Sequence, residues 1–338
     1  MRASVLRNGR MVLRENVAEP VPAPGQVLVA VRACGICGSD LHFAKHGAEV
    51  LALNDQVDGF NGVTIDLNQD IFMGHEFSAE VLEAGPDTDA PNPGTLVTSL
   101  PVLVSPTGFE LIVYSNTTIG GYAERMLLSA PLLTPIPNGL DPRHAALTEP
   151  MAVGLHAVNK SSIQRGEAAL VLGCGPIGIA IVAGLRHRGV ENIVAADFSA
   201  HRRELAEKMG ATTTVDPATG SPFDGSSPAV VFEAVGVPGI IDDILRRAPF
   251  GARVVVAGVC MQADTFHPYF AIAKQINVQF VLAYEGTEFN DCLRAIAEGE
   301  IDVAPMITGT VGLDGVGDAF DDLAYPDTHC KILVTPEP

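Results

Sequence analysis

The feature that most constrains how this chain can fold is a glycine-rich turn near its middle. Gly173, Gly175 and Gly178 have the spacing G-x-G-x-x-G. The apolar run 168–172 comes directly before them and suits a buried parallel strand, and residues 179–188 have a helical pattern. A strand, a glycine turn and a helix in this order predict the start of a doubly wound parallel sheet.

The same turn predicts a dinucleotide site. Gly173 would allow the tight turn, Gly175 would let the backbone approach a pyrophosphate, and Gly178 would permit close packing of helix on strand. The helix that follows opens with Pro176 and Ile177, and its free N–H groups would attract phosphate. The alternative is a glycine turn in a βαβ unit that binds no cofactor.

An acidic residue after the next predicted strand indicates which dinucleotide is bound. Asp197 lies 24 positions after Gly173 and ends the strand 192–196. Its carboxylate could accept hydrogen bonds from the adenine-ribose hydroxyls and would repel a 2′-phosphate, which predicts NAD rather than NADP. Arg202 and Arg203 could instead hold such a phosphate, or could be solvated helix residues. The predicted cofactor contacts also include Arg202, Gly258, Val259 and Lys331.

The two halves of the chain differ in their pattern. Residues 1–150 contain short apolar runs broken by Pro and Gly, which indicates mostly β structure. From residue 168 onward, strand-sized and helix-sized segments alternate, as in a parallel α/β sheet. We therefore predict an α/β protein with two domains.

Cys37, His75 and Glu76 are candidate metal ligands in the first half. A thiolate, an imidazole and a carboxylate suit zinc with one open position. Sequence spacing alone does not establish a metal site, because each of these residues could equally be a packing residue. Cys34 and Cys37 also form a C-x-x-C, a pattern found in redox sites and zinc ribbons, but the chain has no second C-x-x-C.

These features together resemble the medium-chain, zinc-dependent alcohol dehydrogenase family over essentially the whole chain. The stretches that carry the resemblance are 35–42, 74–76, 120–124, 148–157 and 173–197. The resemblance implies a GroES-like β domain formed by residues 1–150 and 287–338, and a Rossmann NAD-binding domain formed by residues 151–286.

The resemblance also implies roles for individual residues. Cys37 and His75 would be ligands of one catalytic zinc, and the third ligand would be Glu149, or Glu76 as in the polyol-dehydrogenase branch. Ser39 and His42 match the family's proton relay, which runs through the nicotinamide ribose. We expect reversible hydride transfer between NAD and a secondary alcohol or polyol, giving a ketone or aldehyde. The family implies a homodimer or homotetramer.

Two other functions are compatible with parts of the sequence. One is the zinc-free quinone or enone reductase branch of the same superfamily, which Cys37 with His75 argues against. The other is a dinucleotide-binding protein without catalysis, which the joint presence of Cys37, Ser39, His42, His75 and Glu149 argues against.

The sequence departs from the family pattern in three places, one of which is Ala283, where polyol-type relatives tend to have a basic residue; this favours a less polar secondary alcohol. Residues 96–118 contain no cysteine, so we expect no structural zinc there and folding by apolar burial instead. Residues 46–70 look like an insertion that carries acidic residues and no Arg or Lys. We expect it to be a lid that disfavours anionic substrates, or else a solvent loop or subunit contact. The expected substrate is a neutral small alcohol or carbonyl compound.

Charge and composition exclude several other classes of protein. The chain has 21 Lys and Arg against 40 Asp and Glu, a net charge of −19, which argues against nucleic acid as a partner. Six scattered cysteines do not suggest a disulfide framework. No apolar run reaches the roughly 18–20 residues of a membrane span, and the start of the chain lacks a signal-peptide pattern. We expect a cytoplasmic protein.

Overall fold

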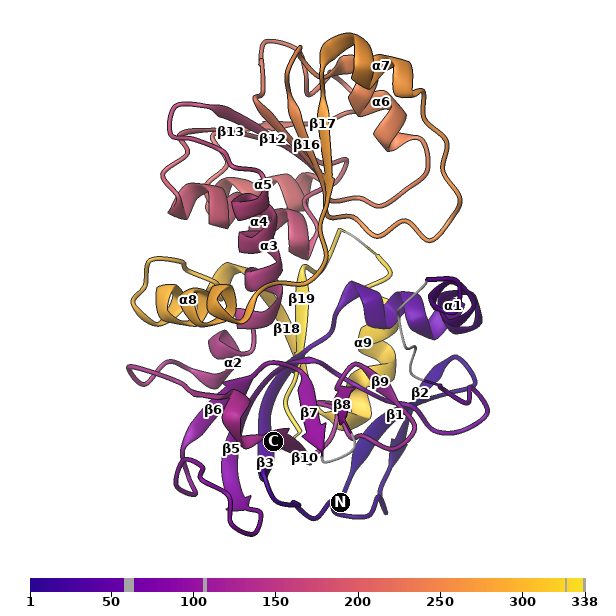
Figure 1. Cartoon of the computed structure of the whole chain (residues 1–338), viewed down its shortest axis with the longest axis vertical. Helices are drawn as coiled ribbons and strands as arrows, with labels where there is room; N and C mark the ends of the chain where they lie inside the picture. Colours follow the sequence, from indigo (N-terminus) through magenta and orange to yellow (C-terminus); the bar gives the residue numbers. More distant parts are fainter. Residues whose placement is uncertain (58–63, 106–107, 326, 337–338) are drawn as a thin grey trace. The chain divides into compact units, whose positions relative to one another are not determined.

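The computed structural model describes residues 1–57, 64–105, 108–325 and 327–336, and the chain in it divides into two compact units (Figure 1). The first unit comprises residues 1–149, 307–325 and 331–338, and the second comprises residues 150–306 and 326–330.

The first unit is mostly β. Its strands are β1 (Ala3–Arg7), β2 (Arg10–Arg14), β3 (Gln26–Gly35), β4 (Phe72–Met73), β5 (Glu76–Ala84), β6 (Leu96–Ser99), β7 (Val102–Ser105), β8 (Gly108–Leu111), β9 (Tyr114–Ser115), β10 (Arg125–Ser129), β11 (Leu133–Pro135), β18 (Ile307–Val311) and β19 (Lys331–Val334). Its helices are α1 (Gly38–Asn54), α2 (Pro142–Ala145) and α9 (Val316–Asp322), with 3-10 turns η1 (Ala130–Leu132) and η3 (Leu313–Gly315).

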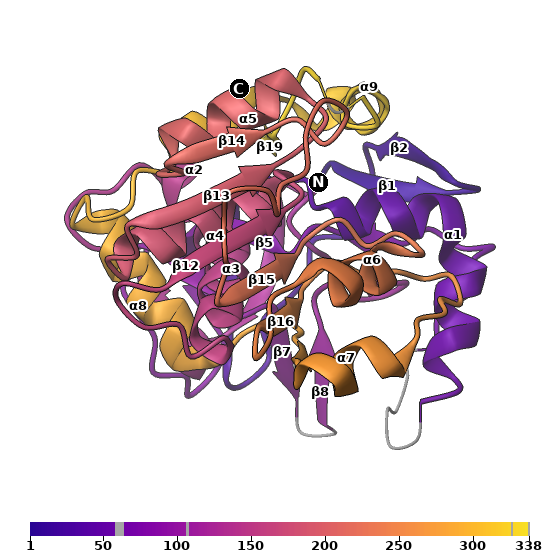
Figure 2. The same cartoon turned by 90° about the horizontal axis from the view of Figure 1, so that it is seen from above.

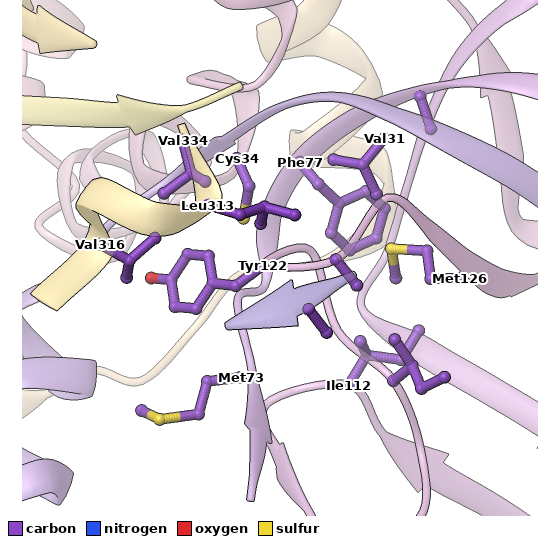
Figure 3. Packing of buried hydrophobic residues seen from close by; sticks show 14 of the residues in the cluster. Val31, Cys34, Met73, Phe77, Ile112, Tyr122, Met126, Leu313, Val316 and Val334 are labelled. Atoms are coloured by element: carbon purple, nitrogen blue, oxygen red, sulfur yellow. The ribbon is translucent and has the colours of Figure 1, made fainter. Parts of the chain in front are cut away.

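The largest sheet of this unit has the strand order β11-β6-β5-β3-β19-β18, and β10 also pairs with β3. Strand β19 lies antiparallel to β3 and parallel to β18, so the end of the chain completes a sheet that its beginning started. Figure 3 shows how this closes the core, because Leu313, Val316 and Val334 pack in one cluster with Phe77 and Tyr122. The GroES-like β domain is confirmed.

Apolar burial does stabilise the cysteine-free stretch that begins at β6. Strands β7 and β8 pair as an antiparallel hairpin, in which Val102 lies opposite Leu111. Leu103 and Ile112 are buried in the core of the first unit, whereas Phe109 is 71% exposed. Leu103 and Ile112 thus provide the apolar burial that was expected for this stretch.

The second unit is an alternating α/β structure. Its strands are β12 (Ala168–Leu172), β13 (Asn192–Ala196), β14 (Thr213–Val215), β15 (Val230–Glu233), β16 (Arg253–Val256) and β17 (Asn277–Phe280). Its helices are α3 (Thr148–Lys160), which starts at the unit border, α4 (Pro176–His187), α5 (Ala200–Lys208), α6 (Ile240–Arg247), α7 (Pro268–Lys274) and α8 (Gly286–Ala297), with the 3-10 turn η2 (Ala304–Met306).

The six described strands of this unit are parallel, in the order β14-β13-β12-β15-β16-β17, and Figure 2 shows β14, β13, β12, β15 and β16 side by side. This is the doubly wound order of a Rossmann sheet, which confirms the predicted fold class. One face is covered by α6, whose Ile244 and Leu245 pack with Leu170 and Val254 of the strands. The chain reverses its winding direction between β12 and β15, and ligands of such sheets bind at the carboxyl ends of these strands.

The second crossover falls after residue 306, not near residue 287 as predicted. Helix α8 is the reason. Its Glu288 accepts hydrogen bonds from Asn159 (2.7 Å) and pairs with His156 (2.7 Å), both on α3, so α8 packs within the second unit. In the described part of the chain, no helix is both long and apolar enough to cross a lipid bilayer.

Candidate active site

Cys37 lies at the junction between β3 and α1, where it caps the helix. Its backbone N–H donates to Oδ2 of Asp40, one turn along the helix (3.1 Å). Asp40 is fully buried and also accepts a hydrogen bond from the hydroxyl of Tyr122 (2.6 Å). The thiol of Cys37 is therefore held by a rigid helix start rather than by a loop.

His75 lies between β4 and β5, directly after a glycine that no other residue could replace without strain. Gly74 has φ +100°, and a Cβ there would lie 2.8 Å from the backbone nitrogen of Tyr122. His75 is buried, and its Nδ1 lies 3.6 Å from Oδ1 of Asp40. Both atoms are buried without a hydrogen-bond partner, so at this distance they interact through charge rather than through a hydrogen bond.

The charges around His75 suit a cation. Burial alone would lower the pKa of His75, but the negative charges of Asp40, Cys37 and Glu149 raise this pKa well above its usual value. Burial also raises the pKa of Asp40. A buried group of anions that draws a proton onto an imidazole would be stabilised at least as well by a metal ion.

Glu76 is buried beside these groups and is held by Lys331, which was predicted to contact the cofactor. The ammonium of Lys331 lies 2.7 and 2.8 Å from the two carboxylate oxygens of Glu76 and donates to the carbonyl oxygen of Ile36 (3.0 Å). Lys331 is 1% exposed, so its positive charge is balanced by Glu76 within the first unit. The pairing of β19 with β3 places Lys331 against Glu76, and a contact of Lys331 with the cofactor stays a prediction.

A sulfur of Cys37, a ring nitrogen of His75 and a carboxylate oxygen of Glu76 all lie within 4.8 Å of one another. Among the described residues, no other group of three such side chains is this close. A soft thiolate, a borderline imidazole and a hard carboxylate together form a ligand set that suits zinc. Glu149, at the start of α3, is near enough for its charge to act on His75. The two candidates for the third ligand thus both lie at this site.

Ser39 and His42 lie on α1 beyond Cys37, and a tyrosine that the sequence did not single out joins them. The hydroxyl of Tyr114 forms a hydrogen bond with the side chain of Ser39, and its ring stacks on Phe43 at 4.0 Å between centroids. Burial raises the pKa of Tyr114 far above its usual value, so the hydroxyl stays protonated. Tyr114 lies in no motif, whereas Asp40 could have been found as a carboxylate three residues after a helix cap.

The glycine-rich turn lies in the second unit, between β12 and α4. Gly173 has φ +89°, and a Cβ on Gly178 would collide with the carbonyl oxygen of Gly173. A Cβ on Gly175, by contrast, would meet no protein atom within 4 Å. Two glycines thus serve the protein's own packing. The third faces open space at the N-terminus of α4, next to Pro176 and Ile177, where a phosphate would be favoured.

Asp197 ties this turn to the end of β13. Its two carboxylate oxygens accept backbone N–H groups of Cys174 and Ser199, each at 2.8 Å. Arg203 donates to the carbonyl oxygen of Asp197 and lies 3.4 Å from the carboxylate of Asp216, so it is engaged within the unit. Arg202 lies 3.9 Å from the carboxylate of Asp197.

Gly258 and Val259 follow β16 at the same edge of the sheet. The N–H of Gly258 donates to the carbonyl oxygen of Glu233 at the end of β15 (2.9 Å). Val259 is 67% exposed, and Val235 beside the glycine turn is 44% exposed. Apolar side chains exposed along the carboxyl edge of the strands are consistent with a bound ligand there.

Comparison with known proteins supports what this geometry indicates. Residues 23–138 match the model of the alcohol dehydrogenase GroES-like domain, and residues 176–298 match that of the zinc-binding dehydrogenase. The chain is 29% identical to (R,R)-butanediol dehydrogenase of Bacillus subtilis, covering 99% of this chain and 100% of that protein. It is 24% identical to sorbitol dehydrogenase of the same organism, over 99% and 97% of the two chains.

Solved structures of similar proteins have the same fold as this chain. The butanediol dehydrogenase structure from Bacillus subtilis superposes with a TM-score of 0.82 over 99% of both chains, at 28% identity. A zinc-binding dehydrogenase of Sinorhizobium meliloti bound to NADP superposes with a TM-score of 0.83 over 99% of both chains, at 30% identity. The chain belongs to the medium-chain, zinc-dependent alcohol dehydrogenase family. It is an oxidoreductase of alcohols or polyols that works with a dinucleotide cofactor.

Proposed function

We propose that the protein is a zinc-dependent, NAD-linked dehydrogenase that interconverts a neutral secondary alcohol or polyol with its ketone or aldehyde. The observation that carries this proposal is the cluster of Cys37, His75 and Glu76, whose ligand atoms lie within 4.8 Å of one another. When bound there, zinc would act as a Lewis acid toward the oxygen of the substrate.

We propose Glu76 as the third protein ligand, with Glu149 as a neighbouring charge. Glu76 belongs to the compact cluster, and its two hydrogen bonds to Lys331 fix the orientation of the carboxylate. A carboxylate has about four lone-pair positions, so two hydrogen bonds leave room for a cation. Glu149 would help to balance the charge on His75.

Three side chains would handle the substrate's hydroxyl proton. Ser39 is exposed next to Cys37 and would accept this proton, with His42 as the residue that returns it to solvent. Tyr114, which forms a hydrogen bond with Ser39 and whose pKa is raised by burial, would orient the serine hydroxyl. All three residues belong to the first unit.

Asp197 supports NAD as the cofactor. Its carboxylate, at the end of β13, can accept hydrogen bonds from ribose hydroxyls and would repel a 2′-phosphate. Arg203, one of the two arginines that could hold such a phosphate, is engaged by Asp216 and by backbone carbonyls. Because the Sinorhizobium meliloti structure is bound to NADP, the preference of this chain for NAD over NADP has to be measured directly.

One experiment tests the proposal as a whole. Purified protein, dialysed against metal-free buffer, is analysed for zinc and screened with NAD and NADP against secondary alcohols, diols, polyols and aldehydes. We expect about one zinc per chain and NAD-linked turnover. Zinc-free protein that still turns over would move it to the quinone-reductase branch, and zinc-loaded protein without turnover on any of these would refute the proposed reaction.

Three broader expectations accompany this proposal. We propose a homodimer or homotetramer, no nucleic-acid partner, and a cytoplasmic location. A net charge of −19 supports the second of these. Light scattering of the purified protein would measure the first.

A further inference from the structure

Helix α1 carries two histidines one turn apart. The ring centroids of His42 and His46 lie 4.9 Å apart, with the ring planes tilted by 39°. The side chain of His46 is 46% exposed, and His42 is partly buried. Solvent, and any ion in it, can therefore reach this pair from outside the first unit.

A carboxylate stands behind the outer histidine. Nδ1 of His46 lies 3.1 Å from a carboxylate oxygen of Glu49. This contact favours the tautomer with the proton on Nδ1, which leaves the lone pair of Nε2 available. Metal-binding histidines are oriented in this way by carboxylates.

The spacing of the two rings suits one shared ion. Two imidazoles that bind one tetrahedral ion at about 2.0–2.1 Å have ring centres roughly 5 Å apart. The measured 4.9 Å agrees with this value. His46 lies at a kink in α1, where φ is −130°, so this spacing belongs to the local fold and not to an ideal helix.

We propose that His42 and His46 form a second divalent-metal site, separate from the Cys37 cluster, with Glu49 as the carboxylate that orients His46. The site would take a borderline ion such as Zn²⁺, Ni²⁺ or Co²⁺, with water in the remaining positions. With only two protein ligands it binds more weakly than the Cys37 cluster does.

The surroundings of His42 disfavour the protonated form of its ring. Burial lowers the pKa of His42, and the nearby His46 and Lys45 lower it further, while Glu49 opposes them. A ring that is free of its proton at neutral pH is ready to bind a metal. The net charge of −19 on the chain also attracts cations toward its surface.

This site would control turnover, a consequence that rests on the proposed function. His42 is the residue expected to return the substrate's proton to solvent, and an ion on its ring would occupy the lone pair needed for that step. We therefore expect a second metal ion to inhibit the enzyme that already holds its catalytic zinc.

Titration calorimetry with Ni²⁺ on the zinc-loaded, dialysed protein tests the site. We expect one additional ion per chain. His46→Ala should abolish this binding, and Glu49→Gln should weaken it by about tenfold, the usual cost of removing an orienting carboxylate. His267→Ala is the matched control. Nδ1 of His267 also lies beside a carboxylate, that of Asp242 at 2.9 Å, but no histidine lies one turn away in the sequence.

The possible outcomes test the second metal site and the proposed role of His42 in the reaction separately. No additional ion, or the same ion in folded His46→Ala protein, would overturn the proposal. Ni²⁺ inhibition that disappears in His46→Ala supports both the site and the role of His42. Binding without inhibition confirms the site but removes His42 from the proton path. Circular dichroism of each variant shows that loss of binding is not loss of fold.

Discussion

The two units hold their candidate sites in different ways. In the second unit, the glycine turn and Asp197 lie within 25 consecutive residues, on one strand, one helix start and the next strand. In the first unit, the side chains of the metal cluster come from separate segments, and Lys331, which pairs with Glu76, lies 255 positions after it. The dinucleotide turn is a local structure, and the metal cluster is a product of sheet pairing.

Because of this difference, a substitution that disables one site should leave the other site able to bind its ligand. A local turn needs its glycines and the strand before it, whereas the cluster needs β3, β5, α1 and β19 in register. Substitutions in the first unit should therefore remove metal and turnover without removing the cofactor, and the following predictions test this from the largest effect to the smallest.

Removing the thiolate of Cys37 should have the largest effect. We expect Cys37→Ala to lose most of its zinc, and turnover to fall by about a thousandfold, as when a strong electrostatic stabiliser of a reaction is removed. NADH binding, measured by fluorescence titration, should be unchanged because the glycine turn lies in the other unit. Cys260→Ala, as control, should keep its zinc. A Cys37→Ala protein with full activity would refute the mechanism.

Breaking the pair of Lys331 and Glu76 should destabilise the first unit. Lys331→Met leaves a buried carboxylate unpaired, and we expect a loss of about 3–5 kcal/mol in the free energy of unfolding of zinc-free protein, measured with urea. Lys331→Met combined with Glu76→Gln should recover part of this loss. If Lys331 acts only on Glu76, the affinity for NADH should not change, and a large decrease would support the predicted contact of Lys331 with the cofactor.

Replacing Asp197 should alter the choice of cofactor. Each hydrogen bond to a charged group contributes about 1.5–3 kcal/mol, so Asp197→Ser should narrow the preference for NADH over NADPH by roughly 10- to 100-fold. Binding titrations with both nucleotides measure this change. Asp216→Ser, which removes the carboxylate beside Arg203, is the control and should change the preference less. Tighter binding of NADPH by the native protein would contradict the assignment.

The smallest effect concerns Glu288 and tests the position of the domain border. Burial raises the pKa of Glu288, but hydrogen bonds from Asn159, the backbone of Glu285 and His156 lower it overall. Because the folded-state pKa lies below the unfolded value of about 4.3, the stabilisation is present above that pH and is lost as the pH falls through the folded value.

Glu288→Gln should therefore reduce the stability of the second unit at pH 7 by about 1–2 kcal/mol. At a pH below both pKa values, the variant and the native protein should differ less, which urea unfolding at pH 7 and at low pH can show. An effect confined to the first unit would mean that α8 packs there instead.

The sequence by itself determined the strand, turn and helix that begin the parallel sheet of the second unit, and the strand that follows them. The predicted strands 168–172 and 192–196 coincide with β12 and β13, because a continuous apolar run between polar neighbours is enough to specify a buried parallel strand. A Cβ on Gly178 would collide with the carbonyl oxygen of Gly173, five residues earlier, so the spacing alone carries the steric reason for Gly178. A Cβ on Gly173 would instead meet Ala234 and Val235, which only the fold brings there. The motif residues of the metal cluster were also recognisable, but only as separate candidates.

Tertiary structure decided which side chains meet. Nothing local in the sequence places Lys331 behind Glu76 or Tyr114 beside Ser39, because these contacts depend on which strands pair and in what register. The border of the second unit was predicted too early for the same reason. The apolar stripe of α8 shows that the helix packs on something, and only the pairing of Glu288 with His156 and Asn159 shows on which unit.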